Sequence, residues 1–146
     1  MTAPINEFRL ISESKSINES FMRAAVSAFV CQLDPTVEEL NDIKTAVSEA
    51  VTNCIVHAYP DEVGKIYISV MYFQNGLVKI KIRDKGRGIE DVKKAREPLF
   101  TTGGNDRSGL GFSVMETFTD KVYVRSAISK GTTVTLLKFI RGRQSD

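Results

Sequence analysis

Hydrophobic and polar residues alternate along five segments of the chain, which predicts five β-strands. The segments are residues 8–11, 65–73, 77–83, 121–127 and 132–140. Gln74-Asn75-Gly76 separates the second segment from the third, and Ser129-Lys130-Gly131 separates the last two. Both linkers carry the turn residues of β-hairpins, so we expect these strands to pair antiparallel.

Four stretches carry the periodicity of helices. The first follows a polar start at which Ser16 or Asn18 can act as the N-cap. Thr36 caps the second, and Glu39, three residues on, completes a capping box. The helices are expected over about residues 18–33, 37–58, 89–96 and 109–119. Together the elements predict an α+β fold, a two-layer sandwich of a mixed, mostly antiparallel sheet with helices on one face.

The second predicted helix has an unusual polar face. Its core-facing stripe consists of Leu40, Ile43, Val47, Val51, Cys54 and Ala58. Glu49 points away from this stripe, and Asn53 and His57 follow at steps of four residues. A solvated back face is the simplest interpretation, but no Lys or Arg follows Lys44 in this helix. We therefore expect both sides of the helix to be covered, and the two oxygen-bearing side chains could hold a hard cation.

Composition limits the class of protein. The chain has 146 residues and a formal net charge of +2, with 42% hydrophobic and 26% charged residues. These values are typical of one soluble domain, here residues 1–146, and exclude a disordered chain. Interspersed charges argue against direct nucleic-acid binding, and no segment is typical of a membrane span or a signal peptide. Cys31 and Cys54 lie on apolar helical faces as expected of core thiols, so we expect a reduced, cytoplasmic protein.

Asp84-Lys85-Gly86-Arg87-Gly88 follows a hydrophobic strand. The two glycines allow positive φ and close approach of a ligand. Asp84 is placed to accept a hydrogen bond from an exocyclic amino group. A simple turn with a capping aspartate is the alternative.

A polar, glycine-containing stretch, residues 101–111, leads into the last predicted helix. The N–H groups at a helix N-terminus can bind phosphate. The stretch lacks the Gly-Lys-[Ser/Thr] ending of a Walker A loop, and no strand directly precedes it as in a Rossmann motif. A surface loop is the alternative.

These features resemble, in their order, the boxes of the GHKL (Bergerat) ATPase superfamily. The order is Glu49-x-x-x-Asn53, Asp84-x-Gly86-x-Gly88, the stretch ending in Gly109-Leu110-Gly111, and Thr132-Thr133. The resemblance covers about residues 16–139. Three stretches look more narrowly like the anti-sigma-F factors of endospore-forming bacteria: Ser48-Glu-Ala-Val-Thr-Asn53, Pro98-Leu-Phe-Thr-Thr102 and Arg107-Ser-Gly-Leu-Gly-Phe112. Ala58 departs from this pattern, since a glycine often stands there.

The resemblance implies binding of ATP or ADP with Mg²⁺. Asn53 would be the Mg²⁺ ligand, Glu49 the general base, and Asp84 the acceptor for the adenine amino group. Thr132 or Thr133 would support the same ring through water. The residues that would also surround the nucleotide are Gly86, Gly88, Thr101, Arg107, Ser108, Gly109, Leu110 and Gly111.

The resemblance also implies a function. The chain would bind and inhibit a sporulation sigma factor and, as an ATP-dependent serine kinase, phosphorylate and inactivate an anti-anti-sigma protein. Arg23 in the first helix would contact both the sigma factor and the anti-anti-sigma protein, so that the two could not bind at the same time. A solvated arginine is the alternative for this residue.

Other functions stay open at this point. A sequestering module that binds nucleotide without phosphoryl transfer is one, although a pure binder needs no base such as Glu49. A detached histidine-kinase ATP domain is disfavoured because the only histidine, His57, lies inside the presumed ATP-binding helix. A gyrase-like ATPase is disfavoured because no transducer domain follows.

A symmetric homodimer is expected as well. The short strand 8–11 would form a sheet edge that needs covering. The first helix has more apolar residues than one core-facing stripe requires: Phe21, Ala25, Ala28 and Phe29.

Overall fold

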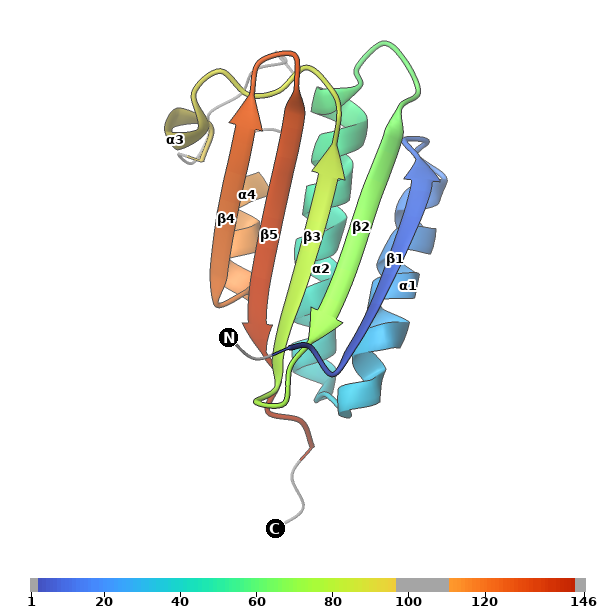
Figure 1. Cartoon of the computed structure of the whole chain (residues 1–146), viewed down its shortest axis with the longest axis vertical. Coiled ribbons are helices and arrows are strands. Elements are labelled where there is room, and N and C mark those ends of the chain that lie inside the picture. Colours follow the sequence, from blue (N-terminus) through green and yellow to red (C-terminus); the bar gives the residue numbers. More distant parts are fainter. Residues whose placement is uncertain (1–2, 97–110, 144–146) are drawn as a thin grey trace.

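The computed structural model describes residues 3–96 and 111–143. In this part of the chain, five strands form one sheet with helices against one of its faces (Figure 1). The strands are β1 (Asn6–Glu13), β2 (Lys65–Tyr72), β3 (Leu77–Asp84), β4 (Lys121–Ala127) and β5 (Gly131–Phe139). Their order across the sheet is β1-β2-β3-β5-β4, and each neighbouring pair is antiparallel. The predicted two-layer α+β sandwich is confirmed.

The helices are α1 (Asn18–Val30), α2 (Val37–Asn53), α3 (Val92–Ala95) and α4 (Gly111–Phe118). A 3-10 turn, Cys31–Leu33, continues α1, and a π-helical turn, Cys54–Ala58, continues α2. The two long helices thus end near the predicted positions, but their last turns have a different geometry. α1, α2 and α4 lie behind the sheet in the view of Figure 1. Among the described residues, no helix has the length and apolar character needed to cross a membrane.

The hydrophobic core lies between the sheet and these helices. Its strand residues are the inward-facing members of the alternating pattern, chiefly Ile66, Ile68, Val70, Val78, Ile80 and Ile82. On the other layer, α1 and α2 contribute Met22, Val26, Val30, Ile43, Val47 and Val51. Ala46 and Ala50 are also buried, because α4 packs against α2 on a second side. The expectation that α2 is covered on both sides is therefore confirmed.

Two expectations for the first helix are wrong. The N-cap position is Ile17, without a side-chain cap, and the Asn18 amide instead donates to the carbonyl of Glu13 at 3.1 Å. Cys31 is exposed, whereas Cys54 is buried as expected. At about 100° per residue, Cys31 lies well away from the buried stripe of Met22, Val26 and Val30, so its thiol does not reach the core.

The capping box of α2 is present and also holds the C-terminal segment. Thr36 Oγ1 accepts from the Glu39 N–H at 3.0 Å, and Glu39 Oε1 accepts from the Thr36 N–H at 2.9 Å. The same carboxylate accepts from the N–H groups of Arg141 at 2.7 Å and Gly142 at 3.1 Å. Partial burial raises the pKa of Glu39, but these hydrogen bonds outweigh it and hold the pKa below its ordinary value.

This arrangement predicts a pH-dependent contribution to stability. Because the pKa of Glu39 is lowered by folding, the stabilisation is present above the unfolded pKa of about 4.3 and is lost as pH falls through the folded pKa. Glu39→Gln should lower the free energy of unfolding at pH 7 by about 1 kcal/mol. It should also flatten the fall in stability below about pH 5. Urea denaturation across pH measures both effects. Glu38→Gln, in the same helical turn, is the control, and equal pH slopes for Glu39→Gln and wild type would contradict the prediction.

Candidate functional site

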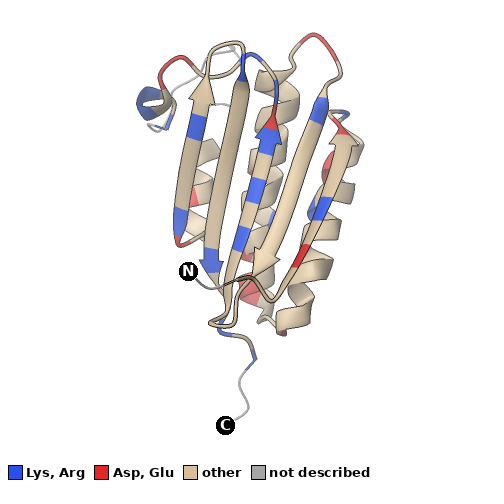
Figure 2. Ribbon diagram, in the orientation of Figure 1, with Lys and Arg blue, Asp and Glu red and all other residues tan. Residues whose placement is uncertain are grey.

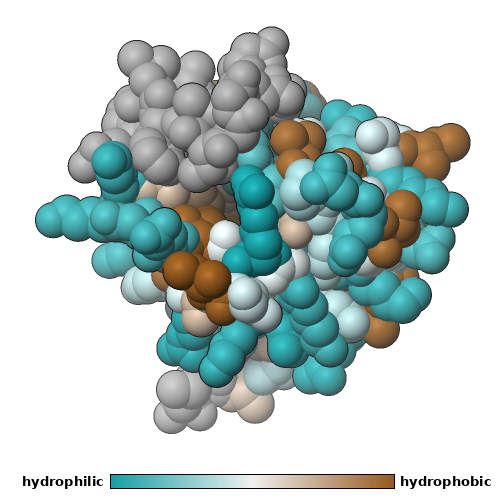
Figure 3. Space-filling view, turned by 90° about the horizontal axis from the view of Figure 1, so that it is seen from above, coloured by the Kyte–Doolittle hydropathy of each residue, from teal (hydrophilic) through white to brown (hydrophobic). Residues whose placement is uncertain are grey.

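A pocket opens at one end of the sheet, with a volume of about 430 Å³. It lies between the end of α2, the segment after β3, the start of α4 and the β4–β5 turn. Its lining includes Ala50, Asn53, Asp84, Gly88, Ile89, Phe112, Ile128 and Thr132. Figure 3 looks onto this end of the molecule, where hydrophobic residues form small patches among hydrophilic ones. The size is within the usual range for a small-molecule site.

Asp84, the last residue of β3, is 4% exposed and holds this end of the molecule together. Its Oδ1 accepts from the backbone N–H of Gly86 at 3.0 Å and of Thr132 at 3.2 Å. The thiol of Cys54 donates to Oδ2 over 3.5 Å. The carboxylate therefore links the segment after β3, the start of β5 and the π-helical turn after α2.

The environment shifts the pKa values of both side chains. Burial raises the pKa of Asp84 above its ordinary value, while the hydrogen bonds from Gly86, Cys54 and Thr132 oppose this rise. Burial, together with the charge of and the hydrogen bond to Asp84, raises the pKa of Cys54 well above its ordinary value. The thiol therefore stays protonated and acts as a donor. Oδ2 retains acceptor capacity for a ligand, because each carboxylate oxygen can accept more than one hydrogen bond.

Apolar side chains line the same pocket as this carboxylate. Ile89 and Ile128 come from the segments after β3 and β4, and Phe112 comes from the first turn of α4. A flat ring fits such walls, and an amino group on the ring could donate to Asp84. The prediction that Asp84 accepts from an exocyclic amino group is compatible with this geometry.

The chain approaches itself closely at Gly86 and Gly88. A Cβ on Gly86 would lie 2.3 Å from the carbonyl oxygen of Ala58. A Cβ on Gly88 would lie 2.1 Å from that of Ala127, and Gly88 also has a φ of +78°. Both glycines are thus required by contacts within the protein, which shape the pocket. The sequence pattern predicts positive φ, which Gly88 has, and close approach of a ligand, but it does not indicate these contacts with the chain itself.

Glu49 and Asn53 meet at the N-terminus of α4. A Cβ built on Gly111 would lie 3.3 Å from both terminal atoms of the Asn53 side chain and 3.6 Å from Glu49 Oε2. The predicted spacing of one helical turn therefore brings a carboxylate and an amide to the same helix terminus. Asn53 and Gly111 both line the pocket, so this end of α4 borders it.

The other predicted residues divide into three groups. Thr132 is buried beside Asp84, but Thr133 lies on the opposite face of the sheet and cannot reach the pocket. Arg23 lies on α1, paired with Glu19 at 3.5 Å, and does not line the pocket. Predicted residues that lie outside the described part of the chain are Thr101, Arg107, Ser108, Gly109 and Leu110.

Sequence reasoning missed several residues of the site. Cys54 was assigned to the core stripe, and nothing in its spacing indicated the bond to Asp84. Tyr59 was seen only as a helix stop, yet its hydroxyl accepts from the Lys85 N–H at 2.6 Å and donates to the Lys65 carbonyl at 2.8 Å. Ile89 and Ile128 come from segments 39 residues apart, and their meeting depends on the sheet order.

An antiparallel sheet backed by helices, with a buried aspartate at a strand end and a Glu–Asn pair on a helix that borders the same pocket, is the arrangement of a class of nucleotide-binding domain. The sequence profile of the histidine kinase-like ATPase domain matches residues 14–138, and the chain belongs to this family. An ATPase domain implies a nucleotide ligand.

Within that class, the chain belongs to the anti-sigma F factors. It is 56% identical over 128 residues to the anti-sigma F factor of Caldanaerobacter subterraneus subsp. tengcongensis, covering 87% of this chain and 89% of that protein. It is 53% identical over 137 residues to the anti-sigma F factor of Geobacillus thermodenitrificans, covering 92% and 93%. The resemblance found in the sequence motifs is confirmed.

Solved structures agree on the fold. The RsbU and RsbW domains of Rv1364c from Mycobacterium tuberculosis superpose with a TM-score of 0.70 at 19% identity, over 99% of this chain and 36% of that one. The histidine kinase domain of a blue-light activated kinase from Erythrobacter litoralis gives a TM-score of 0.58 at 20% identity, over 84% and 61%. At such identities the likeness concerns the fold alone.

Proposed function

We propose that this protein binds and inhibits a sporulation sigma factor and also phosphorylates an anti-anti-sigma protein on serine with ATP. The observation that carries the kinase part is the meeting of Glu49 and Asn53 at the start of α4, beside the pocket that Asp84 closes. Membership in the anti-sigma F factors supports the sigma-factor part. Phosphorylation would inactivate the anti-anti-sigma protein.

ATP or ADP would bind with adenine against Ile89 and Ile128 and with its amino group toward Asp84. The buried carboxylate discriminates between bases, since a ring carbonyl in place of the amino group would face a second acceptor. Thr132 would support the ring from the next strand. The phosphates would then extend toward the N-terminus of α4, where backbone N–H groups favour anions.

The side chains near Gly111 also fit a Mg²⁺ ion. Asn53 offers an amide oxygen beside the carboxylate of Glu49, and hard oxygen ligands suit Mg²⁺, which keeps several waters and binds few protein groups. Asn53 would hold the ion against the phosphates. When bound, Mg²⁺ neutralises charge that develops on the transferred phosphoryl group.

Glu49 would act as the general base. It would accept the proton of the substrate serine hydroxyl while the serine oxygen bonds to the γ-phosphorus and ADP leaves. One helical turn between Glu49 and Asn53 would keep the base close to the phosphates without a direct clash. This role distinguishes a kinase from a module that only sequesters its partner.

The protein partners would dock on α1, around Arg23. The guanidinium is accessible, with the Arg23 side chain 40% exposed, and Glu19 holds it on the helix surface. Phe21 is 57% exposed and gives this surface an apolar component. We also propose that the protein is a homodimer, in which a second copy covers the edge strand β1 and the exposed apolar side of α1 at Phe21.

Asp84→Asn should abolish useful nucleotide binding while the protein stays folded. The amide presents a donor where the adenine amino group needs an acceptor, and the unpaired groups cost about 1–3 kcal/mol or more, which is a loss of affinity of about fivefold to 150-fold or more. Because burial raises the pKa of Asp84, the neutral amide should not destabilise the native state. Calorimetry with ATP measures affinity, and Cys54→Ala, which keeps the carboxylate, is the control. Unchanged ATP affinity in Asp84→Asn would exclude the adenine role.

Glu49→Gln should retain ATP and sigma-factor binding but lose phosphoryl transfer by about 10²–10⁴-fold, because only the base is removed. Transfer is measured with [γ-³²P]ATP and a candidate anti-anti-sigma protein, with Glu62→Gln as a control remote from the pocket. A wild-type rate in Glu49→Gln would exclude the base role. If the wild-type protein binds ATP and the sigma factor but transfers no phosphate, the sequestering module is the correct function.

Arg23→Glu should weaken binding of both protein partners, by about 2 kcal/mol or more, while ATP affinity stays near normal. The substitution reverses the charge of an accessible side chain and places it one turn from Glu19, at a small local cost. Calorimetry with ATP, the sigma factor and the anti-anti-sigma protein measures the three affinities on one preparation. Lys44→Glu is the control for charge reversal. Parallel loss of ATP binding would mean that Arg23 is structural.

A further inference from the structure

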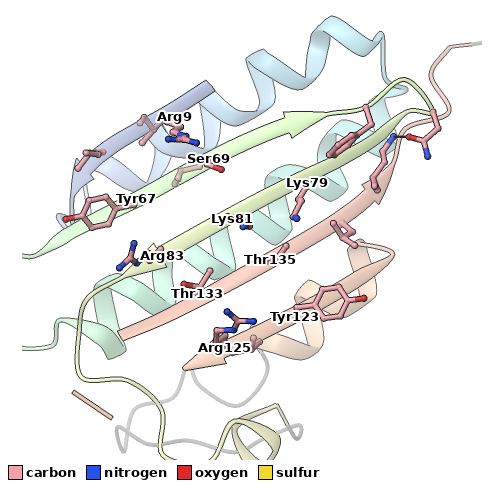
Figure 4. Close-up of a pocket in the computed structure, with 18 of the residues that line it drawn as sticks. Arg9, Tyr67, Ser69, Lys79, Lys81, Arg83, Tyr123, Arg125, Thr133 and Thr135 are labelled. Atoms are coloured by element: carbon pink, nitrogen blue, oxygen red, sulfur yellow. Dashed lines mark hydrogen bonds between the residues drawn. The ribbon is translucent and has the colours of Figure 1, made fainter. Parts of the chain in front are cut away.

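The side of the sheet opposite the helices, which we call the open face, is formed by alternate residues of the five strands. The strand register places Arg9, Ser69, Lys81, Thr135 and Tyr123 in one row across the sheet. These side chains project from the sheet on the side away from the helices (Figure 4). In the described part of the chain, helices α1, α2 and α4 all lie on the other side of the sheet (Figure 1).

Positive charge is concentrated on the open face. The central strand β3 contributes Lys79, Lys81 and Arg83, which show as a blue column in Figure 2. Arg9, Lys65, Lys121 and Arg125 come from the other strands. Acidic residues on this face are Glu7 and Glu13, both on the edge strand β1. Seven basic and two acidic residues give the face a net charge of +5, so the rest of the chain, whose total is +2, carries −3.

Within the described part of the chain, no carboxylate neutralises the charges at the centre of the face. Glu7 pairs with Arg9 at 3.5 Å and Glu13 with Lys15 at 3.2 Å. Among the described residues, Lys79, Lys81 and Arg125 have no carboxylate within 4.0 Å. Like charges at this spacing repel one another, so an anionic partner would relieve the repulsion.

The face is also hollow enough to receive a partner. A shallow trough of about 1570 Å³ runs over it, with Arg9 and Ile11 at one border and Tyr123 and Arg125 at the other. The borders lie four strand spacings apart, or about 19 Å. A helix with its side chains is about 10–12 Å wide, so one helix or two extended segments fit between them. Ile11 and Tyr123, 61% and 52% exposed, provide apolar contacts beside the charges.

We propose that the open face binds an acidic segment of a protein partner, with carboxylates placed over Lys79, Lys81 and Arg83. Alternate residues of a strand are about 6.8 Å apart, and residues four apart on a helix rise about 6 Å. Acidic side chains four residues apart on a helix can therefore lie over successive basic residues of β3, namely Lys79, Lys81 and Arg83. This site is separate from the pocket and does not depend on the function proposed for it.

The charges and aromatic rings favour this occupant over two others. A second copy docked face to face about a two-fold axis would bring the basic columns together, which costs binding energy. Single-stranded nucleic acid would need free aromatic rings for base stacking. The Tyr67 ring already has Lys85 Nζ at 4.9 Å and Arg83 Cζ at 5.9 Å, and the Tyr123 ring has Lys121 Nζ at 5.7 Å.

The test uses an 18-residue helical peptide with glutamates four residues apart and leucines between them. Its matched control has glutamine at each glutamate position. Titration of ¹⁵N-labelled protein should shift amide signals of β3 and β5, while those of the buried face of α2 stay in place. The glutamine peptide should bind at least about tenfold more weakly, and the affinity of the glutamate peptide should fall with added salt.

Charge-reversal variants of the protein test whether the glutamate peptide binds at the basic residues of β3. Lys79→Glu with Lys81→Glu should lose about tenfold in affinity for the glutamate peptide. Lys44→Glu with Lys93→Glu, an equal change in net charge on α2 and α3, should stay within about twofold. If the first pair does not fold, Lys79→Gln with Lys81→Gln should still lose about threefold. Unchanged ATP affinity would show that the pocket is intact.

Three kinds of result would overturn the proposal. One is binding that does not depend on the charges of the face, shown by equal binding of the two peptides or by equal loss in both pairs of glutamate variants. Another is that oligothymidylate binds over Lys79, Lys81 and Arg83 more tightly than the glutamate peptide does, which would assign the face to nucleic acid. The third is a dimer mass in light scattering that Lys79→Gln with Lys81→Gln abolishes, which would assign the face to a second copy.

Discussion

The carboxylate of Asp84 is buried at the end of β3, and the geometry of the pocket depends on how its charge is satisfied. Two backbone N–H groups and the Cys54 thiol donate to it, and these donors come from three separate segments. A buried carboxylate without donors would be too costly to keep ionised. The segments after α2 and β3 and before β5 are therefore held together, and the pocket forms where they meet.

The two faces of the sheet have different roles because successive residues of each strand point alternately toward the helices and away from them. Most inward residues of β2 and β3 are aliphatic and pack on α1 and α2, so that side supplies most of the buried apolar surface. Outward residues carry the excess positive charge. Nucleotide and an acidic protein segment would thus occupy surfaces that do not overlap. Proteins docked on α1 would use a third surface, so each activity can be altered separately by mutation.

Much of the fold follows from short-range sequence signals. Thr36 and Glu39 form the predicted capping box, because its three-residue spacing is a local property of the chain. The hairpin at Gly76 also forms where predicted, with a φ of +87° at that glycine. The N-cap of α1 was predicted wrongly, since Ser16 and Asn18 are both typical caps and neither is used, although the helix begins at Asn18 as expected. Propensity indicates that a helix begins nearby but cannot decide between adjacent polar residues.

The sequence by itself determined the element order, the alternating strands, and the spacing that puts Glu49 and Asn53 one helical turn apart. These are local properties, fixed by the residues and by backbone geometry. Only the tertiary structure decided that the Cys54 thiol donates a hydrogen bond to Asp84. It also decided that Thr132 rather than Thr133 lies in the pocket, and that the basic residues share one face of the sheet. Each of these depends on strand order and register, because pairing between distant segments brings together residues whose separation along the chain carries no signal.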